Sequence, residues 1–126
     1  TAFDHWSQDN ITAFCHNCNT NHNHIVMNSI SSSPRTLTIV FNRFNSSLRK
    51  DNKAIILDPT VDLYGFRGHL KAIVCHHGNT VTSGHYTSVV RNDDIWLLCN
   101  DDKVSNTDFK DFTKSSEVYI AFYTSL

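Results

Sequence analysis

The sequence lacks an excess of charge of either sign. Its 126 residues include 11 Lys and Arg and 12 Asp and Glu, which give a formal net charge of -1 at pH 7. Proteins that bind nucleic acid through its phosphates carry clustered positive charge. The composition therefore argues against a nucleic-acid partner.

Long apolar runs are also missing. A helix that spans a bilayer needs about 20 consecutive apolar residues, and the sequence contains no such run. Residues 1–10 have neither the basic nor the apolar segment of a secretory signal. We therefore expect a soluble protein, cytoplasmic or nuclear, with no membrane partner.

Cysteine is scarce, and its spacing does not favour disulfides. Cys15 and Cys18 form a C-x-x-C pair, whereas Cys75 and Cys99 each lie within an apolar stretch. Thiols stay reduced in the cytosol and nucleus. A buried thiol behaves as a small hydrophobic group with a raised pKa. We expect four free cysteines, with Cys75 and Cys99 buried.

Sustained helical periodicity is absent, and a period of two residues takes its place. Over residues 36–44, Leu37, Ile39 and Phe41 fall on one face of a strand and Thr38 and Val40 on the other, which predicts a half-buried strand. Four further stretches predict strands in the same way: 70–76, 86–91, 95–99 and 118–123. Their hairpin spacing favours an antiparallel sheet.

The connections between these strands predict loops and at most one helical turn. Residues 45–53 are polar apart from Leu48, which predicts a solvent loop. Residues 108–113 predict one turn with Thr107 as its N-cap. A sheet must bury its apolar face against a second layer, and the sequence offers no long helix for this. We therefore expect a helical layer upstream or in another molecule.

A histidine and an asparagine fall where two predicted strands meet. Gly84-His85-Tyr86 leads into one strand and Asn100 follows the next, so a hairpin brings His85 near Asn100. An imidazole held by an Asn or Asp side chain is the base and orienting group of a nucleophilic site. Gly84 suits such a site because a missing side chain lets a substrate backbone approach. By itself the spacing favours a simpler alternative, a turn-end histidine beside an Asx turn.

Four segments of the sequence can be compared with known sequence motifs, both singly and in their order along the chain. They are P-R-T-L-T-I-V-F-N-R-F at 34–44, L-K-A-I-V-C-H-H-G-N-T-V-T-S-G-H-Y at 70–86, W-L-L-C-N-D-D-K-V at 96–104 and Y-I-A-F-Y at 119–123. Together they resemble the strand motif, the histidine box, the box that follows it and the last strand of the ubiquitin-specific proteases. These are papain-like cysteine deubiquitinases, and the resemblance is to the carboxy-terminal part of their catalytic domain.

The resemblance implies an α+β, β-rich fold. It would comprise the antiparallel palm sheet and a fingers remnant of a papain-like cysteine protease domain, with the helical nucleophile-bearing layer absent. Residues 1–126 would form a single partial catalytic domain, with the fingers remnant at 1–30 and the palm with the histidine box at 31–126.

The resemblance also implies catalytic roles. It makes His85 the general base and Asn100 the orienting member of the triad. Asp101 becomes an acidic neighbour that supports or replaces Asn100. No segment matches the cysteine box that bears the family's nucleophile, and none of the four cysteines qualifies. Gly68 stands where the family usually has Tyr.

The histidine box further implies a substrate channel. Gly78, Gly84 and Tyr86, with the loop at 79–84, match the border of the channel for the Gly-Gly tail of ubiquitin. We expect Tyr86 and Trp96 to pack the site and not to react, because aromatic rings of this size usually join a core.

Cys15 and Cys18 stand where the family has the second C-x-x-C pair of its zinc-binding fingers. Structural zinc needs four ligands. A complete local site would need His22 or His24, and the other alternative is a relic pair in a reduced loop. No cofactor is required for the implied reaction, and structural zinc at this pair is an open alternative.

The implied function is deubiquitination. The reaction is hydrolysis of the (iso)peptide bond at the C-terminus of ubiquitin by a thiol mechanism, with this chain supplying the His/Asn half of the triad. The implied partners are ubiquitin or a ubiquitinated protein and an upstream or separate nucleophile-bearing segment. Three alternatives remain: a non-catalytic ubiquitin-binding module or pseudoenzyme, a zinc-dependent structural domain, and another papain-like protease of the same broad fold.

Overall fold

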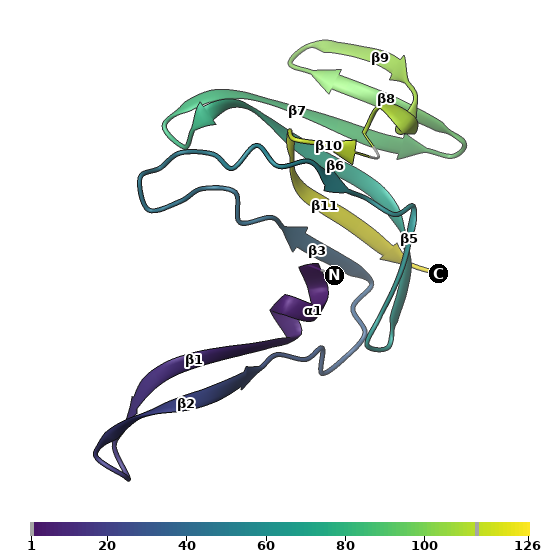
Figure 1. Ribbon diagram of the computed structural model, residues 1–126. Coiled ribbons are helices and arrows are strands. Elements are labelled where there is room, and N and C mark those ends of the chain that lie inside the picture. The colour runs from purple at the N-terminus through teal and green to yellow at the C-terminus, as the bar shows by residue number, and fades with distance from the viewer. Residues whose placement is uncertain (1, 113) are drawn as a thin grey trace. The chain divides into compact units, whose positions relative to one another are not determined.

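The structure is a computed structural model that describes residues 2–112 and 114–126. It contains two compact units, Thr1–Ser33 and Pro34–Leu126, which we describe separately. Both are drawn in Figure 1.

The first unit is a short helix followed by a β-hairpin. Helix α1 (Ala2–Ser7) precedes β1 (Gln8–Cys15) and β2 (Thr20–Met27), which pair antiparallel along their whole length. Asn19 in the turn has a φ of 53°, a left-handed conformation that Asn adopts more readily than most residues. At the open end, the backbone N–H of Asn28 donates to the Ser7 carbonyl at 2.9 Å.

The second unit is built around one antiparallel sheet of seven strands (Figure 1). In sheet order these are β3 (Thr36–Val40), β11 (Val118–Ser125), β6 (Phe66–Thr80), β7 (Ser83–Asn92), β8 (Ile95–Asn100) and β9 (Lys103–Thr107). The seventh, β5 (Thr60–Leu63), pairs with the first residues of β6, while β7 pairs with later ones. Strands β4 (Ile55–Ile56) and β10 (Lys114–Ser115) form a separate pair.

The predicted β-rich, antiparallel fold is confirmed. All five predicted strands are present, but β3 ends at Val40 and not at Phe44 as predicted, and β6 is longer at both ends than the predicted segment 70–76. Within the described residues, helix is confined to α1 and the 3-10 turn η1 (Phe109–Asp111). Neither helix is long and apolar enough to cross a membrane.

The N-cap of η1 is Asp108, so the predicted cap at Thr107 is wrong. The Asp108 carboxylate accepts a hydrogen bond from the backbone N–H of Lys110 at 3.0 Å. Thr107 ends β9 and pairs with Trp96, which leaves it in the sheet. Thr113, the last residue of the predicted turn, lies outside the described residues.

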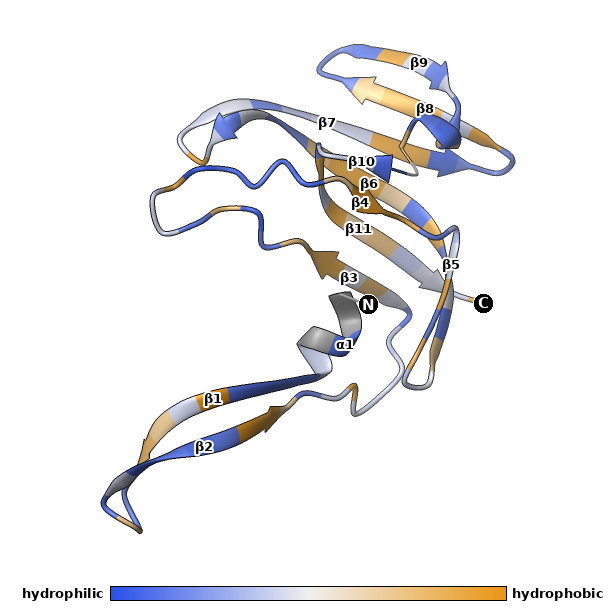
Figure 2. Cartoon of the chain, in the orientation of Figure 1, coloured by the Kyte–Doolittle hydropathy of each residue, from blue (hydrophilic) through white to orange (hydrophobic). Residues whose placement is uncertain are grey.

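The core lies on one face of the long strands β6, β7 and β11. Figure 2 shows hydrophobic residues concentrated along β3, β6 and β11. On β3 the predicted alternation is present, because Leu37 and Ile39 are half-buried while Thr38 and Val40 are exposed. The buried hydrophobic residues are Leu57, Phe66, Leu70, Ile73, Cys75, Val89, Val118, Ala121 and Tyr123.

Residues 45–53 are exposed, as predicted for a solvent loop, with the exception of the buried Lys50. The backbone N–H of Lys50 donates to the Asn79 carbonyl at 2.8 Å, and that of Val81 donates to the Leu48 carbonyl at 3.1 Å. The Lys50 side chain is 0% exposed. This segment therefore braces the turn between β6 and β7, and Lys50 is its one buried residue.

Arg43 ties this segment to the sheet. It is buried, and its guanidinium donates to four backbone carbonyls, those of Asp51, Lys53, Ser115 and Val118. A guanidinium offers five donors in a fixed fork. One side chain thus satisfies carbonyls from three separate parts of the chain.

We expect Arg43→Met to lower the free energy of unfolding by about 2 kcal/mol, because buried carbonyls lose their donor. Urea denaturation of the chain measures this. The control is Arg67→Met, since the exposed Arg67 pairs at the surface with Asp62, and its loss should cost less than about 0.5 kcal/mol. Equal stability of the two variants would contradict the role given to Arg43.

Candidate active site

The ends of β7 and β8 bring His85 and Asn100 together. His85 lies near the start of β7, Asn100 ends β8, and the two strands are antiparallel with Ser88 opposite Cys99. The Nε2 of His85 lies 2.6 Å from the Oδ1 of Asn100. An amide oxygen only accepts hydrogen bonds, so Nε2 carries the proton and donates it. In the neutral imidazole, Nδ1 therefore keeps its lone pair and can act as a base.

Asp101 lies in the turn between β8 and β9. Its φ of 52° is left-handed, a conformation that Asp tolerates better than most residues. Both His85 and Asn100 are exposed, so the imidazole is accessible to groups from outside the chain. Among the contacts of the described residues, Asn100 and not Asp101 bonds to the imidazole.

Gly78 and Gly84 close the bulged end of the β6–β7 ladder. Both have positive φ, 138° and 153°. A Cβ on Gly84 would lie 2.5 Å from both the Nε2 of His76 and the carbonyl oxygen of His77. The sequence interpretation, that glycine is needed for a substrate to approach, is therefore incomplete, because the chain's own groups already require it.

The two aromatic residues expected to pack the site behave differently. Trp96 is half-buried, packs against the core and stacks on Phe109 with ring centroids 5.0 Å apart, which confirms its core interpretation. It lies near the opposite end of β8 from Asn100, so it does not pack the site. Tyr86 is 51% exposed, so the core interpretation is wrong for it. The reason is the strand period, since the buried Thr87 and Val89 face the core and Tyr86 does not share their spacing.

His76 is a buried histidine that the sequence analysis did not single out. It pairs with Tyr86 across the ladder, and its ring makes edge contacts with Phe44, Tyr86 and Tyr119. Burial lowers its pKa, and the positive charge of Lys50 lowers it further. Its Nδ1 has no hydrogen-bond partner among the described residues. His76 is therefore a neutral imidazole beneath Gly84.

The described cysteines are free, as expected. Burial raises the pKa of Cys75 to about 11, in line with its interpretation as a core thiol. Cys99 is only half-buried, so its expected full burial is wrong. Val104, the residue opposite Cys99 on β9, is 62% exposed, so the sheet is open to solvent at this point.

Cys15 and Cys18 lie at the end of β1 and in the turn that follows. The pKa of Cys15 is below its usual value because the backbone N–H of Cys18, and then that of Asn17, donate hydrogen bonds to its sulfur. A thiol with a lowered pKa is a better metal ligand. This pair fits one half of a tetrahedral zinc site.

The other half of such a site is not formed by the described residues, where no three His, Cys, Asp or Glu side chains gather as metal ligands. His22 bonds to the Oγ1 of Thr20 at 2.7 Å, and His24 to the carbonyl of Ala13 at 3.2 Å. Completion by these histidines, considered from the sequence, is not seen.

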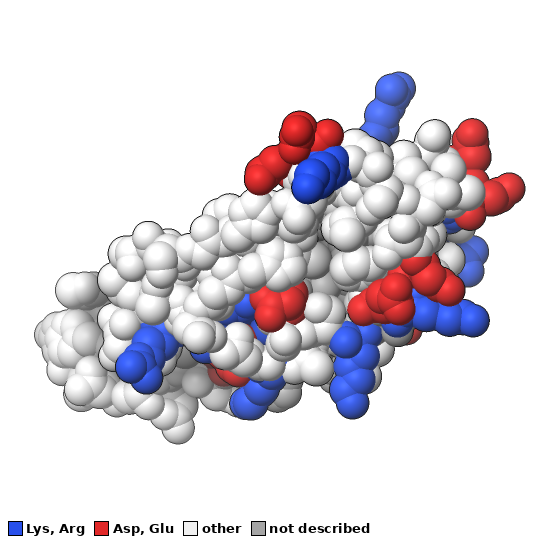
Figure 3. Space-filling model, turned by 90° about the horizontal axis from the view of Figure 1, so that it is seen from above, with Lys and Arg blue, Asp and Glu red and all other residues white. Residues whose placement is uncertain are grey.

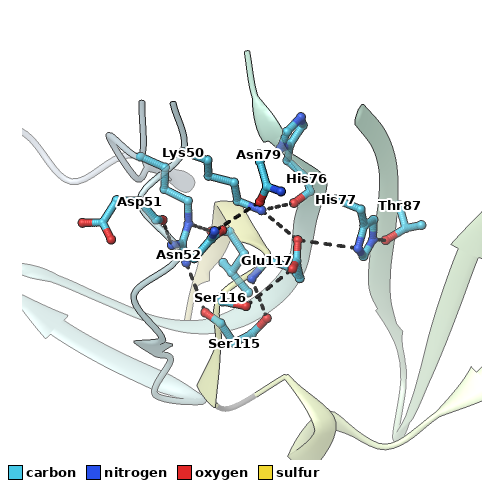
Figure 4. Close-up of polar contacts among 12 residues, drawn as sticks. Lys50, Asp51, Asn52, His76, His77, Asn79, Thr87, Ser115, Ser116 and Glu117 are labelled. Atoms are coloured by element: carbon cyan, nitrogen blue, oxygen red, sulfur yellow. Dashed lines mark hydrogen bonds and ion pairs between the residues drawn. The ribbon is translucent and has the colours of Figure 1, made fainter. Parts of the chain in front are cut away.

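A second polar cluster, which was not predicted from the sequence, lies beside His85. Figure 4 shows Lys50, His77, Thr87 and Glu117 joined by polar contacts. The only sequence signals were the His-His doublet in the histidine box and a lone Glu before the last strand. Figure 3 shows positive and negative side chains interspersed on one face of the molecule.

Comparison with known proteins places this chain in a family. The family model described as ubiquitin carboxyl-terminal hydrolase matches residues 8–123. Ubiquitin carboxyl-terminal hydrolase 44 of Ailuropoda melanoleuca is 42% identical over 57 residues, 44% of this chain and 8% of that protein. Ubiquitin carboxyl-terminal hydrolase 3 of Homo sapiens is 43% identical over 54 residues, 43% of this chain and 10% of that protein. The matched region is thus a small part of these relatives.

Solved structures share the fold. A yeast SAGA DUBm structure superimposes with a TM-score of 0.80 and 25% identity, covering 94% of this chain and 30% of that one. A SAGA DUB module of Ubp8, Sgf11, Sus1 and Sgf73 bound to monoubiquitin gives a TM-score of 0.76 at 24% identity, with the same coverage. With the family match over residues 8–123, these findings show that the chain belongs to the ubiquitin carboxyl-terminal hydrolase family.

Proposed function

We propose that this chain supplies the histidine and asparagine of a deubiquitinase that hydrolyses the (iso)peptide bond at the C-terminus of ubiquitin. The observation that carries the proposal is the 2.6 Å contact between His85 Nε2 and Asn100 Oδ1, which leaves Nδ1 as a base. The solved relatives bound to monoubiquitin and to ubiquitin aldehyde support ubiquitin as the substrate.

In this reaction His85 accepts and donates one proton in each of the two halves. Its Nδ1 holds the proton of the nucleophilic thiol while the thiolate adds to the carbonyl carbon of the last Gly of ubiquitin. The imidazolium then donates that proton to the leaving lysine amine, and the C–N bond breaks. In the second half, His85 takes a proton from water as the water oxygen adds to the thioester carbon. The C–S bond then breaks, the carboxylate of ubiquitin leaves, and the imidazolium returns the proton to the departing thiolate. Asn100 keeps the ring oriented throughout, and Asp101 supports it.

The nucleophile comes from outside this chain, on an upstream or separate segment. Cys75 is unsuited to the role because burial raises its pKa to about 11 and favours the unreactive thiol. None of the four cysteines stands in a segment that resembles the family's cysteine box. We call the chain together with the nucleophile-bearing segment the complete enzyme.

The remaining parts of the chain have supporting roles in this proposal. Residues 31–126 form the palm, in which Gly78, Gly84 and Tyr86 border the channel for the tail of ubiquitin. Residues 1–30 are the fingers remnant, where Cys15 and Cys18 hold one side of a structural zinc whose other ligands lie outside the chain. The free thiols suit a cytoplasmic or nuclear location.

Substitution of Asn100 tests the proposal. We expect Asn100→Ala to lower kcat/KM of the complete enzyme by about 10²-fold, because the imidazole loses its orienting partner. Asn100→Asp keeps an acceptor oxygen and should stay within about 10-fold of the parent. Release of a fluorophore from the C-terminus of ubiquitin measures this, with the exposed Asn106→Ala of β9 as control. Full activity of Asn100→Ala would contradict the proposal.

A non-catalytic ubiquitin-binding module is the second candidate, because no segment of the chain resembles the cysteine box. It predicts that the complete protein binds ubiquitin and that no substitution at His85 or Asn100 changes the rate of amide cleavage. The fluorogenic assay and ubiquitin binding, measured on the same samples, separate the two candidates.

A further inference from the structure

His77 lies directly beside the proposed base. It is the residue opposite His85 in the β6–β7 ladder. The two imidazole rings are stacked, with centroids 6.2 Å apart and planes inclined by 29°, within the range of favourable ring pairs. Asn100 holds the edge of the His85 ring, and the His77 ring lies beside it in a roughly parallel plane. Together they restrict the ring in two directions.

His77 is itself held at both ring nitrogens (Figure 4). Its Nε2 lies 2.8 Å from the Oγ1 of Thr87, a buried residue of β7. Its Nδ1 lies 3.6 Å from the Oε2 of Glu117, an ion-pair distance when His77 is protonated. A rotation of the His77 ring would break its bond to Thr87, so the ring has a preferred plane.

Glu117 is in turn fixed by a buried lysine. The Nζ of Lys50 lies 2.7 Å from the Oε2 of Glu117 and also donates to the carbonyl of His76. Burial of the Glu117 carboxyl favours its neutral form, but the hydrogen bond and charge of Lys50, together with His77, outweigh burial and keep its pKa below the usual value. The carboxylate is therefore ionised where it meets His77.

Stability alone does not explain these buried charges. Desolvating an ammonium group is costly, and a buried ion pair is often no more stabilising than an apolar pair of the same volume. Here the Lys50 side chain is 0% exposed and pairs with Glu117. Glu117 in turn lies beside the half-exposed His77, whose ring is roughly parallel to that of His85. The charges thus lie where they can orient the proposed base.

We propose that His77 is a positioning residue for His85, and that Thr87 and the Lys50–Glu117 pair hold His77 in place. This inference rests on the proposed function, in which His85 is the general base. His85 must present Nδ1 first to the thiol and then to the leaving amine. An imidazole that rotates freely spends less time in the orientation that these proton transfers need. His77 therefore acts on kcat and not on ubiquitin affinity.

The test compares His77 variants of the complete enzyme. His77→Ala should lower kcat about 10-fold and leave KM within about twofold, since misplacement of a catalytic group affects the chemical step. His77→Phe keeps a flat ring beside His85 but loses the contacts to Thr87 and Glu117, so it should restore kcat only in part, to within about fivefold of the parent. His69→Ala is the control, a half-buried histidine of the same strand that bonds to Thr124, and it should leave kcat unchanged.

His85→Ala, assayed in parallel, separates this inference from the proposed function. If His85→Ala keeps full kcat, both are overturned. If His85→Ala loses activity while His77→Ala keeps it, only the positioning role is overturned. A loss in His77→Ala that lies in KM, or that His77→Phe does not restore, also overturns that role.

Thr87→Val serves as a second variant in case His77→Ala does not fold. It removes the hydrogen bond to the His77 ring and nearly preserves side-chain volume. We expect it to lower kcat about threefold with KM unchanged, because His77 loses one of its two restraints. An unchanged kcat in Thr87→Val would overturn the positioning role.

Discussion

His85→Ala is expected to lower kcat/KM of the complete enzyme for ubiquitin amide substrates by about 10³-fold, within the range for loss of a general acid–base group. The imidazole both holds the thiol proton and returns it to the leaving amine, so neither half of the reaction proceeds normally without it. The rate of hydrolysis of a fluorogenic ubiquitin amide measures the effect. Because His85 is exposed, folding should be unaffected.

The matched control for this experiment is His69→Ala, another histidine of the same sheet. Its ring bonds to the Oγ1 of Thr124 at 3.3 Å, far along β6 from the His85 partner His77. Ubiquitin binding by the two variants should be similar, since His85 acts on the reacting bond. If His85→Ala kept more than a tenth of the parent activity, His85 would not be the base.

Gly84→Ala is expected to lower the free energy of unfolding by about 3 kcal/mol, by combining a strained φ with a steric clash. The new Cβ would meet the His76 ring and the His77 carbonyl at 2.5 Å. A backbone carbonyl in a ladder cannot move freely, so the start of β7 must shift and His85 with it. We expect a further loss in kcat of about 10²-fold, from misplacement of the base.

Gly65→Ala separates backbone strain from the clash at Gly84. Gly65 also has a positive φ, 89°, but a Cβ there would meet no atom of the described residues within 4 Å. Its substitution should cost only about 1 kcal/mol, the penalty for a left-handed residue. Thermal and urea unfolding of both variants give the comparison. Equal losses of stability and activity would show that the contact with His76 and His77 does not matter.

The parts of the fold that sequence predicted are those set by local pattern. The alternation of Leu37 and Ile39 with Thr38 and Val40 is the period of a strand with one buried face, and β3 has it. Hairpin spacing brings His85 and Asn100 within hydrogen-bond distance, as expected, because antiparallel neighbours pair through short turns. The catalytic role of these two residues stays a prediction.

The missed features depend on long-range contacts or lack a pattern. Lys50 and Glu117 are far apart in sequence, so no local signal marks their pair. Polar composition predicted the exposed segment 45–53 but could not distinguish the buried Lys50 from its neighbours. Strand β9 is an exposed edge strand with an even burial pattern, so no alternation reveals it. Strands β1 and β2 were not predicted for the same reason, because most of their residues are exposed.

The most direct test of the central claim is intact mass after incubation with ubiquitin that bears a thiol-reactive electrophile at its C-terminus. We predict no adduct on this chain alone and one ubiquitin adduct on the nucleophile-bearing segment of the complete enzyme, strongly slowed by His85→Ala. Labelling of the chain alone at Cys15, Cys18, Cys75 or Cys99 would contradict the claim that the nucleophile comes from outside it.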